Sequence, residues 1–192
     1  PALFARIKAV VDGGENLKGE EKQLLDETYQ SFVRAGAELT DTDRERVNVI
    51  SEELAGLTTE FGQNVLKDTN EFELVLEAGE DTAGLPDFVL EMGKAEAEAR
   101  DKSGKYVFTT SRSSITPFLQ YAEKRDRREQ IYKAYTECGT RGTDNHPIIQ
   151  RVVSLRSERA KLLGFQSHAD FMLDDRMAKT PEAVTNLLDQ VW

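Results

Sequence analysis

The sequence predicts a mainly α fold, and two observations support this. Residues 40–69 carry apolar side chains at spacings of three and four, which form one stripe along a long helix: Val47, Ile50, Leu54, Leu57, Phe61 and Val65. Alternation with period two is confined to short segments around residues 71–77 and 105–110, so the β content is expected to be one small two-stranded sheet.

The first two predicted helices cover about residues 18–37 and 40–69. Gly36 is a suitable stop for the first, and Thr40 and Asp41 offer side-chain oxygens that can cap the start of the second. We expect these two long helices to pack as an antiparallel pair.

The middle of the chain combines both periodicities. In residues 71–77, Phe72, Leu74 and Leu76 alternate with three glutamates and Val75, and residues 105–110 contain Tyr-Val-Phe, so we expect two paired strands. Between them, Pro86 suits a first helical turn and the alanine-rich run that follows predicts a helix over about 86–100.

Helices return after the second strand. An apolar pattern predicts a helix over about 114–138 that ends at Gly139, followed by a loop over 138–145. Pro147 and Gly164 delimit a helix over about 147–163, and a short helix over 167–174 follows.

The last predicted helix covers about 181–192. Thr180 and Pro181 fit its first positions, and its apolar stripe runs to Trp192 without a capping residue. We therefore expect residues 1–192 to form a single helical region, truncated at its C-terminus and continued in a longer protein.

Composition and charge exclude several function classes. Twenty-five basic and 35 acidic residues give a net charge of −10, which disfavours binding to nucleic acid and to anionic membrane surfaces. Apolar runs are far shorter than the roughly 20 residues that span a bilayer, and the first residues lack the pattern of a secretory signal. A lone cysteine, Cys138, suits a reducing compartment, so we expect the cytoplasm.

Metal-binding and nucleophilic patterns are also missing. The chain has two histidines, His146 and His168, and neither belongs to an H-E-x-x-H or Glu-x-x-His motif. We interpret both as structural histidines and Cys138 as a helix-end thiol, with no base or orienting group assigned to it. We therefore assign no catalytic, cofactor-binding or metal-binding residue to this chain.

Two segments, a pair of glycines and a basic run, have some features of an anion-binding site. Gly139 and Gly142 lack the strand context and the lysine of a phosphate loop, so they are interpreted as turn glycines. The basic run Lys124–Arg128 can contact phosphate or an acidic peptide, but acidic residues interleave it, which favours a solvated helix junction.

Several long stretches resemble a known family. Segments 38–76, 84–99, 117–142 and 155–184, which include LTTEFGQNVL, YKAYTECGTRG and MAKTPE, resemble the amino-terminal region of the thimet oligopeptidase and peptidyl-dipeptidase family of zinc metallopeptidases. The bacterial peptidyl-dipeptidase branch is the closest in this resemblance, which covers nearly the whole chain.

The resemblance implies a larger, two-lobed, mostly helical fold around a channel that admits short peptides. In the family, two histidines of H-E-x-x-H and a downstream glutamate hold zinc, and all of these lie beyond the matched region. It implies that this chain is a non-catalytic part, inactive alone, that forms channel wall and restricts substrate size. Its partners would be the C-terminal catalytic part of the same polypeptide and short peptides, from which the whole protein would release C-terminal dipeptides or internal fragments.

An alternative is a helical protein-interaction module without enzymatic activity, which would use the stripe around Leu54, Leu57 and Phe61. The substitution Leu57→Asp distinguishes the two, because it unfolds a core but only removes a partner from a module. We also expect self-association through Val184, Leu188 and Val191, which the predicted last helix exposes.

Overall fold

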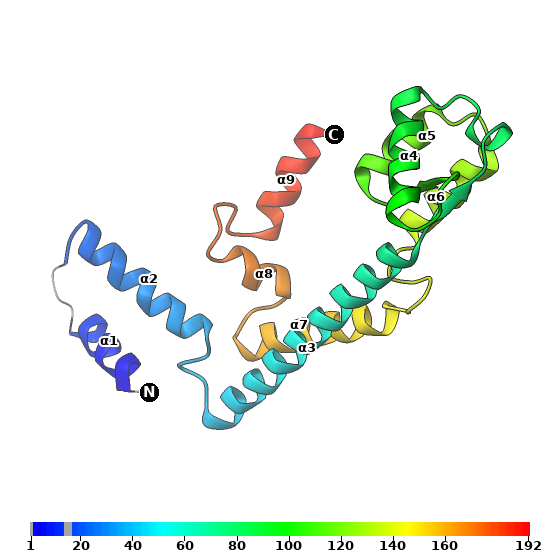
Figure 1. Ribbon diagram of the computed structural model, residues 1–192. Coiled ribbons are helices and arrows are strands. Elements are labelled where there is room, and N and C mark those ends of the chain that lie inside the picture. The colour runs from blue at the N-terminus through cyan, green and yellow to red at the C-terminus, as the bar shows by residue number, and fades with distance from the viewer. Residues whose placement is uncertain (1, 14–16) are drawn as a thin grey trace. The chain divides into compact units, whose positions relative to one another are not determined.

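A computed structural model describes residues 2–13 and 17–192 (Figure 1). It confirms a mainly α fold with one small sheet, and the elements in order are α1 (Ala2–Asp12), α2 (Glu20–Arg34), α3 (Asp41–Glu71), β1 (Leu74–Leu76), the 3-10 turn η1 (Glu80–Thr82), α4 (Asp87–Ala99), β2 (Tyr106–Phe108), α5 (Arg112–Tyr121), α6 (Arg125–Thr136), α7 (His146–Leu162), α8 (His168–Leu173) and α9 (Pro181–Val191). None of the described helices is long and apolar enough to cross a membrane.

The chain divides into two compact units. The first combines Pro1–Gly56 with Gln150–Trp192, and the second is Leu57–Ile149. The prediction of a single region over residues 1–192 stays a prediction.

In the first unit, α2 packs mainly against α1, an element that the sequence pattern did not predict. The Phe4 ring stacks on Tyr29 at 5.8 Å between ring centroids and lies 5.9 Å from Phe32. This aromatic contact covers the apolar face of α2 that the sequence assigned to the long helix α3. The predicted antiparallel pair of helices 18–37 and 40–69 therefore differs from the packing observed.

The first part of α3 is instead linked to α7. Arg46 donates two hydrogen bonds to Glu158 at 2.6 and 2.8 Å, and Arg151 reaches Glu53 in the same two-pronged way. Because these pairs run in opposite directions along the two helices, α3 and α7 lie antiparallel here. The predicted stripe is buried in this part of α3, at Val47, Ile50 and Leu54.

In the second unit, the two predicted strands pair antiparallel, with Leu74 opposite Phe108 and Leu76 opposite Tyr106. The sheet packs on α4 and contacts α5 and α6 (Figure 1). Alternation places one face of the strands in a core formed by Leu74, Leu76, Leu85, Val89, Phe108, Ile115, Phe118, Ala122 and Ile131.

Several residues that the sequence suggests for helix ends lie at such ends in the structure. Thr180 accepts a hydrogen bond from the Ala183 amide, and Pro181 is the first residue of α9. Thr40 accepts one from the Asp43 amide at the start of α3. Gly36 and Gly164 adopt positive φ angles just after α2 and α7, which only glycine adopts without strain.

The structure differs from the predicted single helix over 114–138. Residues Ala122–Lys124 leave the helical conformation, so that α5 and α6 are separate helices joined at a corner. The Glu123 amide donates to the Ala83 carbonyl at 3.0 Å, and Gly84 lies so close that a β-carbon there would be 2.5 Å from the Tyr121 carbonyl oxygen. The helix is therefore interrupted where the chain contacts a distant segment. Residues Ala122–Lys124 themselves contain no glycine or proline that would predict the interruption.

Candidate functional site

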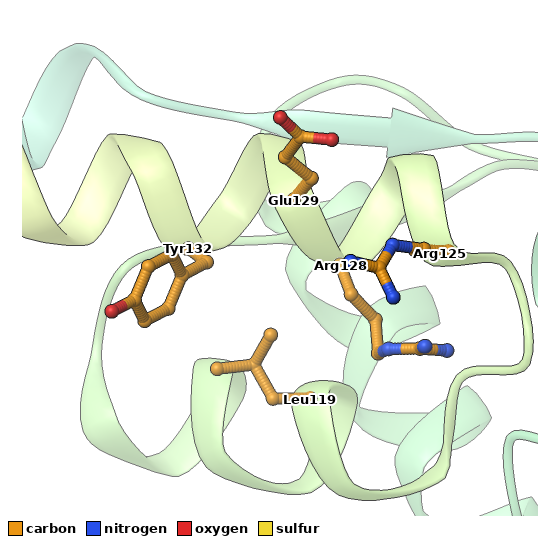
Figure 2. A pocket seen from close by; sticks show the side chains of 5 residues that line it. All are labelled: Leu119, Arg125, Arg128, Glu129 and Tyr132. Carbon is orange, nitrogen blue, oxygen red and sulfur yellow. The ribbon is translucent and has the colours of Figure 1, made fainter.

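A pocket lies between α5 and α6 and holds about 340 Å³. We call it the α5–α6 pocket and define it by its lining residues: Leu119, Arg125, Arg128, Glu129 and Tyr132. Leu119 comes from α5, and the other four recur along one face of α6 at spacings of one helical turn. Figure 2 shows the two guanidinium groups at one end and the Tyr132 ring at the other, with Leu119 between them.

Arg128 is held in place by the corner that creates the pocket. Its Nη1 donates to the carbonyl oxygen of Ala122 and, at 2.8 Å, to that of Glu123. These two carbonyls follow α5, where backbone acceptors lack helical partners. Arg128 thus closes the end of α5 and brings positive charge to the pocket.

Glu129 has its own partner. Its carboxylate lies 2.6 Å from the Lys133 ammonium, and this hydrogen bond and charge hold the pKa of Glu129 below its usual value. In Figure 2 the Glu129 side chain turns away from Leu119 and the two arginines. The pocket therefore presents mainly cationic and apolar groups.

The basic run Lys124–Arg128 is divided between two tasks. Lys124 and Arg127 both bind the Asp81 carboxylate, at 2.9 and 3.0 Å, and thereby join η1 to the start of α6. The hydrogen bonds from Arg127 and then Lys124 lower the pKa of Asp81. Arg125 and Arg128 remain for the pocket, and the run lies at a helix junction, as the sequence predicts.

A second polar cluster fixes the loop between α6 and α7. The buried Asp68 carboxylate accepts hydrogen bonds from the amides of Gly139, Arg141 and Gly142, at 2.8 to 3.3 Å. Asn145, also buried, accepts from the Asn64 amide nitrogen at 2.8 Å. Three amide donors satisfy the carboxylate within the chain, so we interpret this cluster as structural.

Sequence reasoning missed Asp68, although a signal existed. Asp68 follows Val65 by three positions and so continues the apolar stripe of the long helix. A carboxylate at such a position predicts burial with dedicated donors. Its donors are the amides of Gly139, Arg141 and Gly142. The sequence identifies the two glycines as turn residues but does not show that they face Asp68.

Cys138 and His146 lie apart from the α5–α6 pocket. The Cys138 sulfur is 3.2 Å from the Thr69 hydroxyl and 3.4 Å from the Val65 carbonyl oxygen, which places it at the end of α6 beside α3. His146 starts α7, and its Nδ1 lies 2.6 Å from the Asp144 carboxylate. The His146 amide and then its ring lower the pKa of Asp144.

His168 lies in the first unit beside two arginines of α7. Its pKa is lowered by burial and by the positive charges of Arg156 and Arg159, and its Nδ1 is buried without a hydrogen-bond partner. The ring is 6.2 Å from that of Phe171, which also lies beneath Arg34. A neutral, packed imidazole suits the predicted structural role.

A zinc site requires at least three protein ligands held close together. Within residues 2–13 and 17–192, no three His, Cys, Asp or Glu side chains lie close enough together to hold a metal ion. The residues present therefore do not fit the zinc site that the resemblance implies for the whole protein, and no chemical step is assigned to zinc here.

Comparison with known proteins finds similarity to peptidases of one family. Residues 118–192, which include the α5–α6 pocket, match the model of Peptidase family M3. Dipeptidyl carboxypeptidase of Escherichia coli is 33% identical over 195 residues, which cover 98% of this chain and 28% of that protein. Oligopeptidase A of Haemophilus influenzae is 32% identical over 177 residues, which cover 89% of this chain and 26% of that protein.

This chain is a homologue of the M3 peptidases. A probable cytosolic oligopeptidase A of Arabidopsis thaliana is similar too, at 32% identity over 98% of the chain and 28% of its own length. The chain thus spans about a quarter of the length of the curated M3 relatives it matches. Proteins named as oligopeptidases and as dipeptidyl carboxypeptidases match it nearly equally well.

Proposed function

We propose that this chain is the non-catalytic N-terminal part of a zinc-dependent M3 oligopeptidase that hydrolyses short peptides. The observation that carries the proposal is the extent of the similarity, which covers nearly all of this chain but only about a quarter of each relative. The part of a peptidase that corresponds to this chain can lack the zinc ligands if the rest supplies them.

Within the whole protein, this part would form channel wall and restrict the size of the substrate. A wall must be rigid without chemistry of its own, and the packed helices, bidentate ion pairs and satisfied buried carboxylate fit that task. The same proposal includes two finer points. The whole protein would release C-terminal dipeptides, as the resemblance to the bacterial peptidyl-dipeptidase branch implies, and it would lie in the cytoplasm. The relatives named dipeptidyl carboxypeptidase and probable cytosolic oligopeptidase A support them.

The partner of this part would be the catalytic remainder of the same polypeptide. The apolar side chains of α9 support this, because Leu187, Leu188 and Val191 expose 62%, 51% and 76% of their surface. In the isolated chain, a second copy would cover the same face.

Two experiments test the proposal. The coding DNA after the Trp192 codon should continue in frame and encode H-E-x-x-H, and a stop codon at that point would refute it. The protein made from the whole frame should cleave a fluorogenic short peptide in a zinc-dependent manner. The 192-residue chain should retain no zinc after dialysis and cleave nothing, so stoichiometric zinc or robust hydrolysis by the chain would contradict the division of labour.

A further inference from the structure

We propose that the α5–α6 pocket binds a free carboxylate attached to a small apolar group, such as the last residue of a short peptide. The proposal rests on the pocket itself and holds whether or not the chain is part of a peptidase. The charge of the pocket, the fixed position of Arg128 and the apolar lining support it.

The positive charge of the pocket is only partly balanced by the protein. Lys124 and Arg127, from the same basic run, are both paired with Asp81. Among the described residues, neither Arg125 nor Arg128 forms an ion pair with a carboxylate, and Glu129 is paired with Lys133. Arg125 also feels the charge of Glu129, but that carboxylate is shared with Lys133, so the two neighbouring guanidinium groups leave a net positive site for an anion.

Arg128 is also held in position for binding. The two carbonyl contacts of Arg128 occupy its Nη1 and leave Nε and Nη2 for a ligand. Figure 2 shows the Arg125 guanidinium beside that of Arg128. A planar guanidinium matches a carboxylate with two parallel hydrogen bonds, and holding it in place beforehand lowers the entropy lost on binding.

The remainder of the lining selects among anions. Leu119 and the Tyr132 ring offer apolar surface next to the arginines, and this surface suits a carboxylate with an aliphatic or aromatic substituent better than inorganic phosphate. The pocket holds about 340 Å³ and opens broadly to solvent, so it can take a small group while the rest of the ligand extends into water. The free end of a peptide with an apolar last residue meets both conditions.

The test is an NMR titration of the ¹⁵N-labelled 192-residue protein with N-acetyl-glycyl-leucine, its C-terminal amide and inorganic phosphate. We expect saturable shifts of the Leu119 and Tyr132 amides with the free acid, at least about tenfold weaker binding of the amide, and weaker binding of phosphate. Equal binding of acid and amide would overturn carboxylate recognition. Tighter binding of phosphate would overturn the selectivity, and no saturable shift with the acid would overturn the site.

Two variants, each of which removes one positive charge, test where the ligand binds. Arg125→Gln should weaken the free acid about tenfold, because it removes one guanidinium without touching the bonds by which Arg128 closes the corner. Arg112→Gln, at the exposed start of α5 and outside the pocket, should leave binding unchanged. Equal losses in both variants would show general charge attraction, and no loss in Arg125→Gln would refute the pocket.

Discussion

Asp68 and Gly142 are fitted to each other: the Gly142 amide donates to the Asp68 carboxylate at 3.2 Å, and a β-carbon on Gly142 would lie 2.6 Å from that same oxygen. The Gly139 amide is the closest donor to the carboxylate, at 2.8 Å. The loop that follows α6 is therefore held on α3 by one buried anion.

Replacing this anion should destabilise the second unit. In Asp68→Asn, an amide NH2 group replaces one acceptor oxygen and faces backbone donors, so we expect a loss of about 1–3 kcal/mol in the free energy of unfolding. Urea unfolding followed by circular dichroism measures it. The matched control is Glu71→Gln, an exposed acid at the end of the same helix, which should change stability by less than about 0.5 kcal/mol.

Replacing two helical glycines with alanine should change the free energy of unfolding in opposite directions. A β-carbon on Gly93 in α4 would lie 2.7 Å from the Phe108 ring, so Gly93→Ala should cost about 1–3 kcal/mol in unfolding free energy. Gly62 in α3 has open space around it, so Gly62→Ala should gain about 0.5–1 kcal/mol from helix propensity. Equal effects in urea unfolding would mean that α4 does not pack on β2 as described.

The stability of the first unit should depend on pH through His168. Its pKa is lowered in the folded protein by burial and by Arg156 and Arg159, whereas the unfolded histidine titrates near about 6.5. The unfolded state therefore binds a proton first, and stability should fall as pH drops from about 6.5 toward the folded pKa. A ¹H NMR titration of the ring should give a midpoint below the unfolded value, and His168→Gln should remove this part of the pH dependence. A midpoint above 6.5 would contradict the arginine contacts.

Self-association should run through α9. Sedimentation equilibrium at tens of micromolar should show dimers or larger species, because Leu187, Leu188 and Val191 leave apolar surface in water. The double variant Leu187→Glu and Leu188→Glu should be monomeric with unchanged helicity. A strictly monomeric parent chain, or association that persists in the variant, would assign the contact to another surface or to none.

The sequence predicted those parts of the fold that local chemistry determines. Thr180 with Pro181, Gly36 and Gly164 mark helix ends through their own backbone preferences. The strand β1 is predictable because Leu74 and Leu76, which are buried, alternate with residues that face the solvent. Periodicity alone reveals which face is buried but not against what. The partner of α2 was therefore misassigned, since the Phe4 ring that covers it belongs to a helix that was not predicted.

The α5–α6 pocket was beyond reach of the sequence for a related reason. In the sequence, Arg125 and Arg128 belong to a basic run. Leu119 and Tyr132 belong to the apolar pattern of one long predicted helix. They converge only because the chain turns at Ala122–Lys124, where no glycine or proline occurs. The turn depends on Ala83 and Gly84, which are remote in sequence.

This dependence means that the pocket can be altered without changing any residue that lines it. Gly84 has a φ of +79° and no room for a side chain against the Tyr121 carbonyl, so a larger residue there must push the corner open. The carbonyls that hold Arg128 would then move away from α6, and Leu119 would separate from the arginines. Ligand affinity would thus be tuned from a turn on a different segment, with every contact group chemically intact.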